Sequence, residues 1–145
     1  MFQSEKSIVI DRELEKVYAV AETYPRFVDF YKEKEIIFEN QSKIVVKICS
    51  SFYGKILKWE GEGIKYKNKS IDFTQTKGLL KGLRATWLFE GLNKKSTRAT
   101  IRTQFNFQFF FGKLFEKVIG SLLIPKTTAN ILSCLKNTVE SNTKT

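Results

Sequence analysis

Hydrophobic and polar residues along this chain repeat with changing periods, which divide it into extended and helical segments. Residues 2–10 read as a first strand, and Asp11 is a candidate N-cap for a helix that follows. Apolar side chains from Leu14 to Ala21 then recur at the helical spacing i, i+3, i+4 and i+7. Pro25 suits the first position of a second short helix, which is rich in aromatic residues. The pattern therefore predicts one strand followed by two short helices.

The period becomes two in the middle of the chain. Apolar and polar residues alternate in six runs, at residues 36–39, 44–49, 57–62, 71–74, 84–90 and 98–108. Turn-forming residues separate these runs at 40–42, 53–54, 67–69 and 92–96. Gly61 and Gly63 within one run predict a β-bulge or a sharp bend. One apolar and one polar face are typical of an antiparallel sheet that is covered on one side.

A helical period returns after Phe111. Apolar residues between Leu114 and Val139 share one helix face over roughly seven turns, and Pro125 predicts a kink or break near residues 122–124. This helix is the natural cover for the sheet. The chain is therefore predicted to be an α+β protein with one domain over residues 1–145. Its curved antiparallel sheet of about seven strands wraps around a long C-terminal helix, with two short helices after the first strand.

Composition favours binding over catalysis. The chain holds 13 Phe and 2 Trp in 145 residues, and each buried aromatic side chain removes roughly 150–250 Å² from water. These side chains fill a core or line a cavity that a ligand completes. The sequence has no His, which is the usual proton carrier near neutral pH and the commonest metal ligand. Cys49 and Cys134 are predicted to be buried, inert thiols. No metal site and no cofactor are predicted.

The net charge of +10 favours anionic partners such as phospholipid headgroups or nucleic acid. Lysines are spread along the chain with no block of five or six, so most are predicted to form a solvated face, and no DNA contact is expected. No secretory signal follows Met1, and the longest uncharged stretch, 103–112, is about half the roughly 20 residues of a spanning helix. The protein is predicted to be cytoplasmic.

Three stretches carry a family resemblance. They are Val17-Tyr18 followed by Tyr-Pro-Arg-Phe at 24–27, then 78–89, where Leu-Lys-Gly-Leu-Arg precedes Trp-x-Phe, and the Thr-rich 97–107, which ends in Phe-Asn-Phe. With the order of elements, they resemble the helix-grip fold of the START-like superfamily. More narrowly, the chain is similar to the coenzyme Q-binding START-domain, polyketide cyclase and ribosome-association toxin families. This resemblance implies an apolar ligand, such as a polyprenyl quinone or another lipid, that the protein carries or presents.

Two groups of residues are candidates for this function. The predicted wall of the cavity, on the sheet and the long helix, consists of Trp59, Phe73, Trp87, Phe89, Phe105, Phe107, Ile119 and Leu122. A lid or membrane-facing group consists of Tyr24, Phe27, Phe30, Leu79 and Leu80. Leu79 and Leu80 lie between two predicted strands near cationic residues, so they suit peripheral contact with an anionic membrane.

Two alternatives stay open. An enzyme of the polyketide cyclase type would need a polar group inside the cavity. The alternation places the candidate residues on the polar face instead, and no catalytic residue is predicted; these candidates are Glu60, Asp72, Arg84 and Arg102. A regulator that binds the ribosome, which the toxin relatives imply, is compatible with the charge. No basic cluster or stacking platform is visible for it in the sequence.

Overall fold

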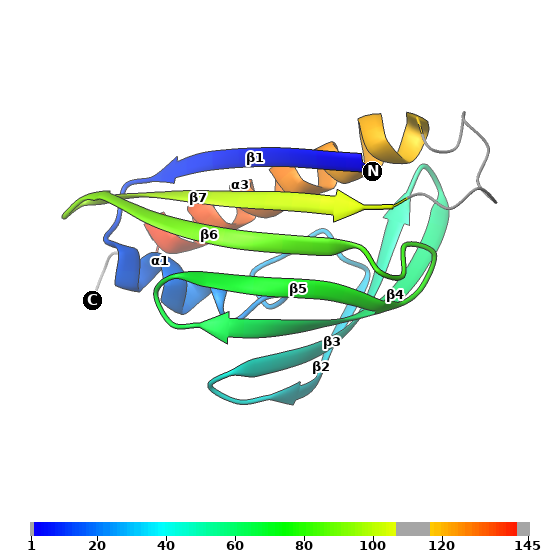
Figure 1. Cartoon of the computed structure of the whole chain (residues 1–145), viewed down its shortest axis with the longest axis horizontal. Coiled ribbons are helices and arrows are strands. Elements are labelled where there is room, and N and C mark those ends of the chain that lie inside the picture. Colours follow the sequence, from blue (N-terminus) through cyan, green and yellow to red (C-terminus); the bar gives the residue numbers. More distant parts are fainter. Residues whose placement is uncertain (1, 107–116, 142–145) are drawn as a thin grey trace.

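One curved sheet of seven antiparallel strands wraps around the C-terminal helix (Figure 1). The computed structural model describes residues 2–106 and 117–141. The strands are β1 (Phe2–Ile10), β2 (Glu33–Glu39), β3 (Lys43–Phe52), β4 (Lys55–Tyr66), β5 (Ser70–Lys77), β6 (Arg84–Asn93) and β7 (Ser96–Phe105). The described helices are α1 (Leu14–Ala21), the π-helical η1 (Ile119–Leu123) and α3 (Ile124–Ser141). The predicted α+β helix-grip architecture is confirmed.

Neighbours in sequence are neighbours in the sheet, apart from the first strand. The spatial order is β1-β7-β6-β5-β4-β3-β2, and β1 pairs antiparallel with β7 from Phe2↔Phe105 to Ile10↔Thr97. The alternation read from the sequence sets the covered face, because successive side chains of a strand point to opposite sides. Trp87 in β6 is buried, for example, while Arg84 is exposed.

The sheet bends where glycines lie in β4, as predicted. The register between β4 and β5 shifts between Glu60 and Gly61, which leaves Thr76 as the extra residue of a bulge. Gly63 pairs with Phe73 of β5, and a Cβ atom at Gly63 would lie only 2.6 Å from the Phe73 ring. The absence of a side chain at Gly63 therefore lets the Phe73 ring lie across the neighbouring strand.

The prediction of two short helices after the first strand is wrong, because α1 is the one helix between β1 and β2. The N–H groups of Thr23, Tyr24, Arg26 and Val28 donate to carbonyls three residues earlier, at 2.9–3.1 Å, as in successive turns. Residues 24, 27, 28 and 31 are all buried, so their spacing imitates a helix. We call residues 22–31 the turn segment.

The predicted Asp11 N-cap is also wrong. Helix α1 begins at Leu14, and Glu13 stands at its N-cap without a side-chain hydrogen bond. The backbone N–H of Asp11 instead donates to the Glu140 carboxylate at 3.0 Å, and Arg12 donates to the Glu140 carbonyl at 2.7 Å. These bonds fix the C-terminal end of α3 beside the end of β1.

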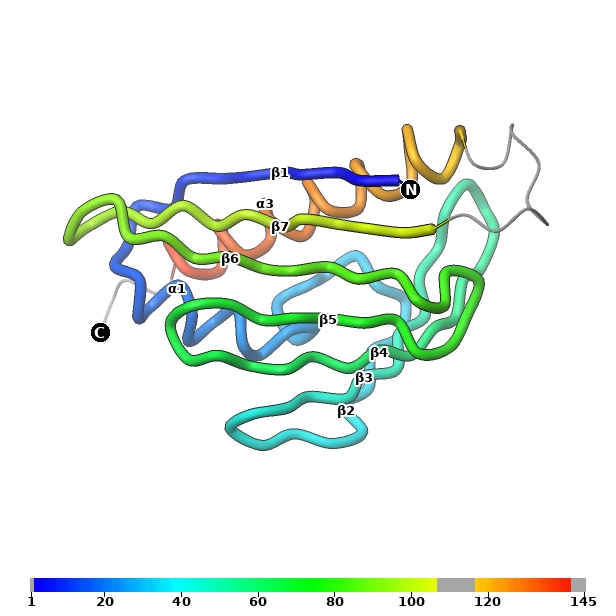
Figure 2. Tube along the Cα trace, in the orientation of Figure 1, coloured from blue at the N-terminus to red at the C-terminus, as the bar shows by residue number. Residues whose placement is uncertain are grey.

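The C-terminal helix changes its winding next to Pro125. Residues Ile119–Leu123 form a π-helical turn, and α-helical bonding follows from Ile124. Pro125 has no N–H to donate to the carbonyl four residues earlier, so the predicted irregularity near residues 122–124 is confirmed. Figure 2 shows α3 running along β1 and β7 on the covered side of the sheet.

Two clusters of buried side chains result. The larger one joins the sheet, α1, the turn segment and the C-terminal part of α3, and it includes Val17, Val28, Ile71 and Leu135. The smaller one consists of Leu80, Phe105, Ile119 and Ile124. Between the two clusters, the side chains of the sheet and of α3 leave part of the space unfilled.

Substituting Gly63 by Ala should destabilise the fold, because the new methyl group overlaps the Phe73 ring and also lies 3.0 Å from Ile44. We expect a loss of about 1–3 kcal/mol in the free energy of unfolding, measured by urea denaturation. Gly91→Ala is the control, since the nearest atom to its Cβ is 4.0 Å away. Equal stability of the two variants would mean that the Phe73 ring can move aside.

Candidate ligand-binding cavity

A cavity of about 430 Å³ lies between the sheet and the N-terminal part of α3. This volume falls in the usual range for small-molecule sites, roughly 300–1,000 Å³. The cavity is lined by Tyr24, Tyr31, Ser50, Ile56, Leu57, Lys58, Trp59, Phe73, Thr74, Gln75, Leu79, Leu80, Leu83, Ala85, Trp87, Ile101, Thr103, Leu123, Ile124, Thr127, Thr128 and Ile131. Most of these side chains are apolar, so the cavity is suited to a hydrophobic molecule.

Five aromatic side chains form one continuous wall, which consists of Tyr24, Tyr31, Trp59, Phe73 and Trp87. Tyr24 lies at the centre, and its ring is 5.0 Å from the Phe73 ring, 5.3 Å from the Trp87 ring and 6.2 Å from the Tyr31 ring. Tyr31 in turn packs edge-on against Trp59 at 6.3 Å. Edge-to-face packing of this kind holds the rings in fixed orientations.

The floor of the cavity is formed by residues that the register of the sheet brings side by side. Phe73, Ala85 and Thr103 are directly opposite one another on β5, β6 and β7, and Trp87 is opposite Ile101 in an adjacent row. Ala85 is the smallest of these residues and lies between Phe73 and Thr103. A small side chain at this position leaves space above the middle of the sheet.

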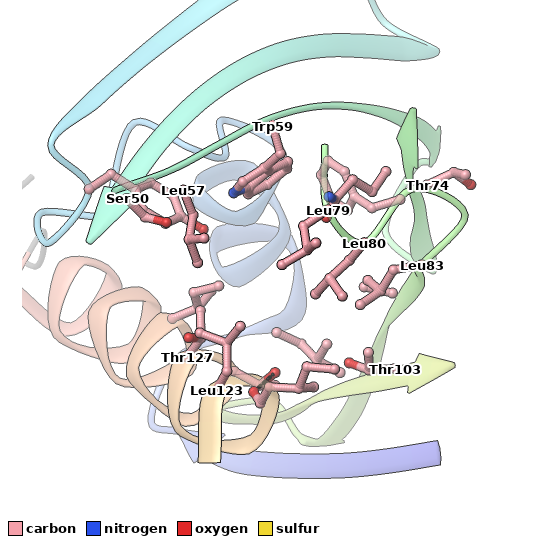
Figure 3. Close-up of a pocket in the computed structure, with 18 of the residues that line it drawn as sticks. Ser50, Leu57, Trp59, Thr74, Leu79, Leu80, Leu83, Thr103, Leu123 and Thr127 are labelled. Atoms are coloured by element: carbon pink, nitrogen blue, oxygen red, sulfur yellow. Dashed lines mark hydrogen bonds between the residues drawn. The ribbon is translucent and has the colours of Figure 1, made fainter. Parts of the chain in front are cut away.

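The helix supplies the opposite wall. Leu123, Thr127 and Ile131 lie on one face of η1 and α3, at the four-residue spacing that aligns side chains along a helix. Figure 3 shows Leu123 and Thr127 facing the space enclosed with Trp59 and Leu79. The Thr128 hydroxyl donates to the Ile124 carbonyl at 2.7 Å, so its proton is not available to a ligand.

The cavity reaches the surface at its rim, which we define as Ile56, Lys58 and Leu79. Each of these lining residues is exposed, with Leu79 at 46%. Figure 2 shows the β3–β4 turn, the loop between β5 and β6, and η1 at one end of the molecule, and the β6–β7 turn at the other. The Lys126 ammonium lies 5.9 Å from the Tyr53 ring, which joins α3 to the β3–β4 turn beside this rim.

A pair of tyrosine hydroxyls is buried in the aromatic wall. The Tyr24 and Tyr31 oxygens are 2.6 Å apart, and one hydroxyl donates to the other. Burial raises the pKa of Tyr24 well above its usual value near 10, and the neighbouring Tyr31 adds to this rise. Burial likewise raises the pKa of Tyr31. Both phenols therefore stay neutral and protonated near pH 7.

The structure brings three of the eight predicted wall residues to the cavity, namely Trp59, Phe73 and Trp87. Phe89 points to the same side of the sheet but packs edge-on against Tyr18 of α1, at 5.6 Å. Phe105 and Ile119 lie in the smaller buried cluster, where they contact protein instead. Leu122 is 45% exposed, since the π-helical turn directs it outward. Phe107 lies outside the described residues.

Some of the predicted lid residues line the cavity and others do not. Tyr24, Leu79 and Leu80 line the cavity, but Leu80 is only 8% exposed and belongs to the smaller cluster. Phe27 is buried against Trp87 with ring centroids 6.1 Å apart, so it supports the wall from behind. Phe30 is partly exposed and packs against the Tyr31 ring.

Sequence reasoning missed several lining residues. Tyr31 belongs to a segment that was expected to be a helix, and Thr103 is a polar residue on the apolar face of β7. Alternation in the strand 98–108 could have identified Thr103, because it lies two residues from Ile101 on the same face. The alternation of apolar and polar residues does not indicate which of two inward-facing residues lines the cavity.

The polar candidates for catalysis do not line the cavity. Glu60 contacts Lys77 at 3.6 Å and Arg102 contacts Glu5 at 3.5 Å, while Asp72 and Arg84 are also outside the lining. Within residues 2–106 and 117–141, no three His, Cys, Asp or Glu side chains are grouped to hold a metal ion. Burial raises the pKa of the Cys134 thiol, which keeps it protonated near neutral pH.

The chain belongs to the polyketide cyclase/dehydrase and lipid transport family, whose model matches residues 10–131. Its fold is similar to that of a protein from Thermus thermophilus (TM-score 0.83, 15% identity, covering 98% of this chain and 99% of that one). The Zhui aromatase/cyclase from Streptomyces sp. R1128 has a TM-score of 0.81 at 16% identity, and the match covers 95% of this chain and 93% of that one. A START superfamily protein from Mycobacterium smegmatis has a TM-score of 0.77 at 14% identity, and the match covers 99% of this chain and 100% of that one.

No curated protein matches the sequence. At these identities the solved structures show the fold alone, which places the chain in the START-like superfamily together with its family model. None of the helices in the described part of the chain combines the length and hydropathy needed to cross a bilayer.

Alkaline pH should destabilise the protein through the tyrosine pair. The folded-state pKa of each phenol lies above its unfolded value near 10, so the stabilising contribution is complete below pH 10 and falls as pH rises towards the folded-state value. We expect a loss of about 1.4 kcal/mol per pH unit for each tyrosine in this range. Urea denaturation between pH 9 and 11.5 measures it.

The double variant Tyr24→Phe/Tyr31→Phe is the control for this titration. Its free energy of unfolding should fall much less steeply above pH 10, because the two groups that lose protons on unfolding are absent. Identical slopes for the variant and the parent protein would contradict the assignment.

Proposed function

We propose that this protein binds a hydrophobic small molecule in the cavity between the sheet and α3. The observation that carries the proposal is the lining itself, in which five aromatic side chains and the apolar face of the helix enclose about 430 Å³. A molecule that loses about 200 Å² of apolar surface to this wall gains roughly 5 kcal/mol before the costs of binding. This favourable contribution requires no charged contact.

The finer form of the proposal is a carrier or presenter of a polyprenyl quinone or another lipid. The family to which the chain belongs includes lipid transport in its description, which supports this form. An exposed rim also supports it, since a carrier has to release its ligand and the rim offers a route from the cavity to the surface. A quinone ring with an isoprenoid tail would place the ring among the aromatic side chains.

An enzyme related to the aromatase/cyclases is the second candidate. It is supported by the aromatase/cyclases among the structures with the same fold. Against it stand the positions of the carboxylates in the described part of the chain, none of which lines the cavity. Tyr24 and Tyr31 are hydrogen-bond donors that release a proton only at high pH, so they suit binding better than general base catalysis.

Release at an anionic membrane is a further part of the proposed function. Ile56 and Leu79 at the rim are apolar and exposed, and Tyr53 is 72% exposed at the tip of the neighbouring turn. Lysines accompany them, at Lys55, Lys58 and Lys81. Apolar side chains between cations suit the surface of a bilayer that contains acidic lipids.

The central proposal is tested by organic extraction of the purified protein, with native mass spectrometry before and after. We expect a released apolar molecule and a matching loss of mass. Ala85→Phe should abolish this adduct, because the new ring occupies the floor of the cavity. Ala129→Phe is the matched control on the exposed side of α3. An empty protein that no quinone or lipid stabilises against heat would contradict the proposal.

Membrane contact is tested by sedimentation with vesicles of equal parts phosphatidylglycerol and phosphatidylcholine. Leu79→Ser should weaken binding about fivefold, because a half-exposed Leu contributes about 1 kcal/mol when it enters the bilayer. Leu92→Ser is the control, since Leu92 is 38% exposed in β6 near the opposite end of the molecule. Equal effects of both substitutions would exclude the rim as the contact surface.

A further inference from the structure

The Tyr24–Tyr31 pair holds one hydrogen-bond donor more than it uses. Two neutral hydroxyls carry two protons, and only one of them can lie between oxygens that are 2.6 Å apart. Neither hydroxyl has another partner among the described residues. Both side chains are more than nine-tenths buried and both line the cavity, so the second O–H has no bulk water to bond with. A buried donor without an acceptor is unfavourable.

Two other polar groups of the lining also make no hydrogen bond to the described residues, although neither is fully enclosed by protein atoms. Thr103 is 3% exposed, and its hydroxyl has no hydrogen-bond partner in the described part of the chain. Figure 3 shows the Thr103 oxygen directed towards the space between the sheet and the helix. Trp87 is likewise 3% exposed, and its indole N–H has no acceptor among those residues. Trp87 and Thr103 are diagonal neighbours on β6 and β7, so their Cα atoms are about 7–8 Å apart.

Charge is excluded from the inner part of this cavity. Among residues 2–106 and 117–141, its lining has no Asp, Glu or Arg, and the one lysine there, Lys58, is exposed at the rim. An ion placed among the aromatic rings would lose its hydration without gaining an opposite charge. The inner end of any ligand is therefore neutral.

We infer that the ligand presents a neutral oxygen acceptor, of the carbonyl type, on a flat ring system that lies against the aromatic wall and accepts from the Tyr24–Tyr31 pair. Thr103 and Trp87 supply further donors for a second oxygen on the same ring system. This inference rests on the proposed function, because it specifies which hydrophobic molecules the cavity selects. A saturated hydrocarbon chain, or an acyl chain whose carboxylate lies at Lys58, would leave these donors without acceptors.

The test compares fluorenone with fluorene, which share a ring skeleton and differ by one carbonyl oxygen. Fluorenone is the more soluble in water, so without a hydrogen bond in the cavity fluorene binds more tightly. We expect the parent protein to bind fluorenone at least fivefold more tightly than fluorene, measured for both by isothermal titration calorimetry. The ratio of the two affinities cancels general effects of a variant on the cavity.

Substitutions then locate the donor. Tyr24→Phe/Tyr31→Phe should lower the affinity ratio to one or less, because the hydroxyls are removed while both rings remain. Tyr18→Phe is the matched control, because Tyr18 is buried but lies outside the lining, and it should leave the ratio unchanged. Thr103→Val should leave most of the preference, because fluorenone has one carbonyl oxygen and the inference places it at the tyrosine pair. Bound fluorene also reports that each variant is folded.

The outcomes separate the two proposals. If fluorene and fluorenone bind the parent protein equally, the cavity binds hydrophobic molecules but the oxygen is not recognised, and this inference fails alone. If the preference for fluorenone persists in the double tyrosine variant, the assigned donor is wrong and this inference fails. If neither compound binds or stabilises the parent protein, the proposed function fails and the inference fails with it.

Discussion

The ring of Tyr24 lies at the centre of the contact between the turn segment and the sheet. It contacts Phe73 and Trp87 of the sheet on one side, and Phe27 and Tyr31 of the turn segment on the other. The backbone of the turn segment makes the hydrogen bonds of successive turns, and the Lys34 ammonium donates to the Arg26 and Val28 carbonyls. The ring contacts complete the attachment of this segment to the sheet. Because aromatic rings are rigid, they fix the distance between the turn segment and the sheet instead of collapsing into the remaining space.

The cavity follows from a mismatch between the curved sheet and its cover. Helix α3 packs along β1 and reaches β7, and its C-terminal end is fixed beside Asp11 and Arg12. Towards its N-terminal end the helix faces β5 and β6, where Ala85 is too small to fill the gap. The Gly63 position lets the Phe73 ring turn across β4, which supports the wall without filling the space.

The order of strands and the long helix could be predicted because alternation and helical spacing are properties of neighbouring residues. Trp59, Phe73 and Trp87 could be placed on the covered face by the same argument. The sequence could not show that Phe89, on the same face, lies outside the cavity. Phe89 differs from Trp87 by packing against Tyr18 of α1, and this contact depends on the tertiary structure. The turn segment was misjudged because burial at 24, 27, 28 and 31 imitates a helix, although successive turns produce it here.

The character of the cavity's polar groups bears on what kind of protein this is. An active site for acid–base chemistry needs a group that exchanges a proton near neutral pH, and burial moves the phenols Tyr24 and Tyr31 away from that range. A binding site instead needs donors whose protonation is fixed, so that affinity does not vary with pH. Neutral phenols, a threonine hydroxyl and an indole N–H meet that requirement. Discrimination by such groups acts against ligands that lack an acceptor, because the buried donor is then unpaired.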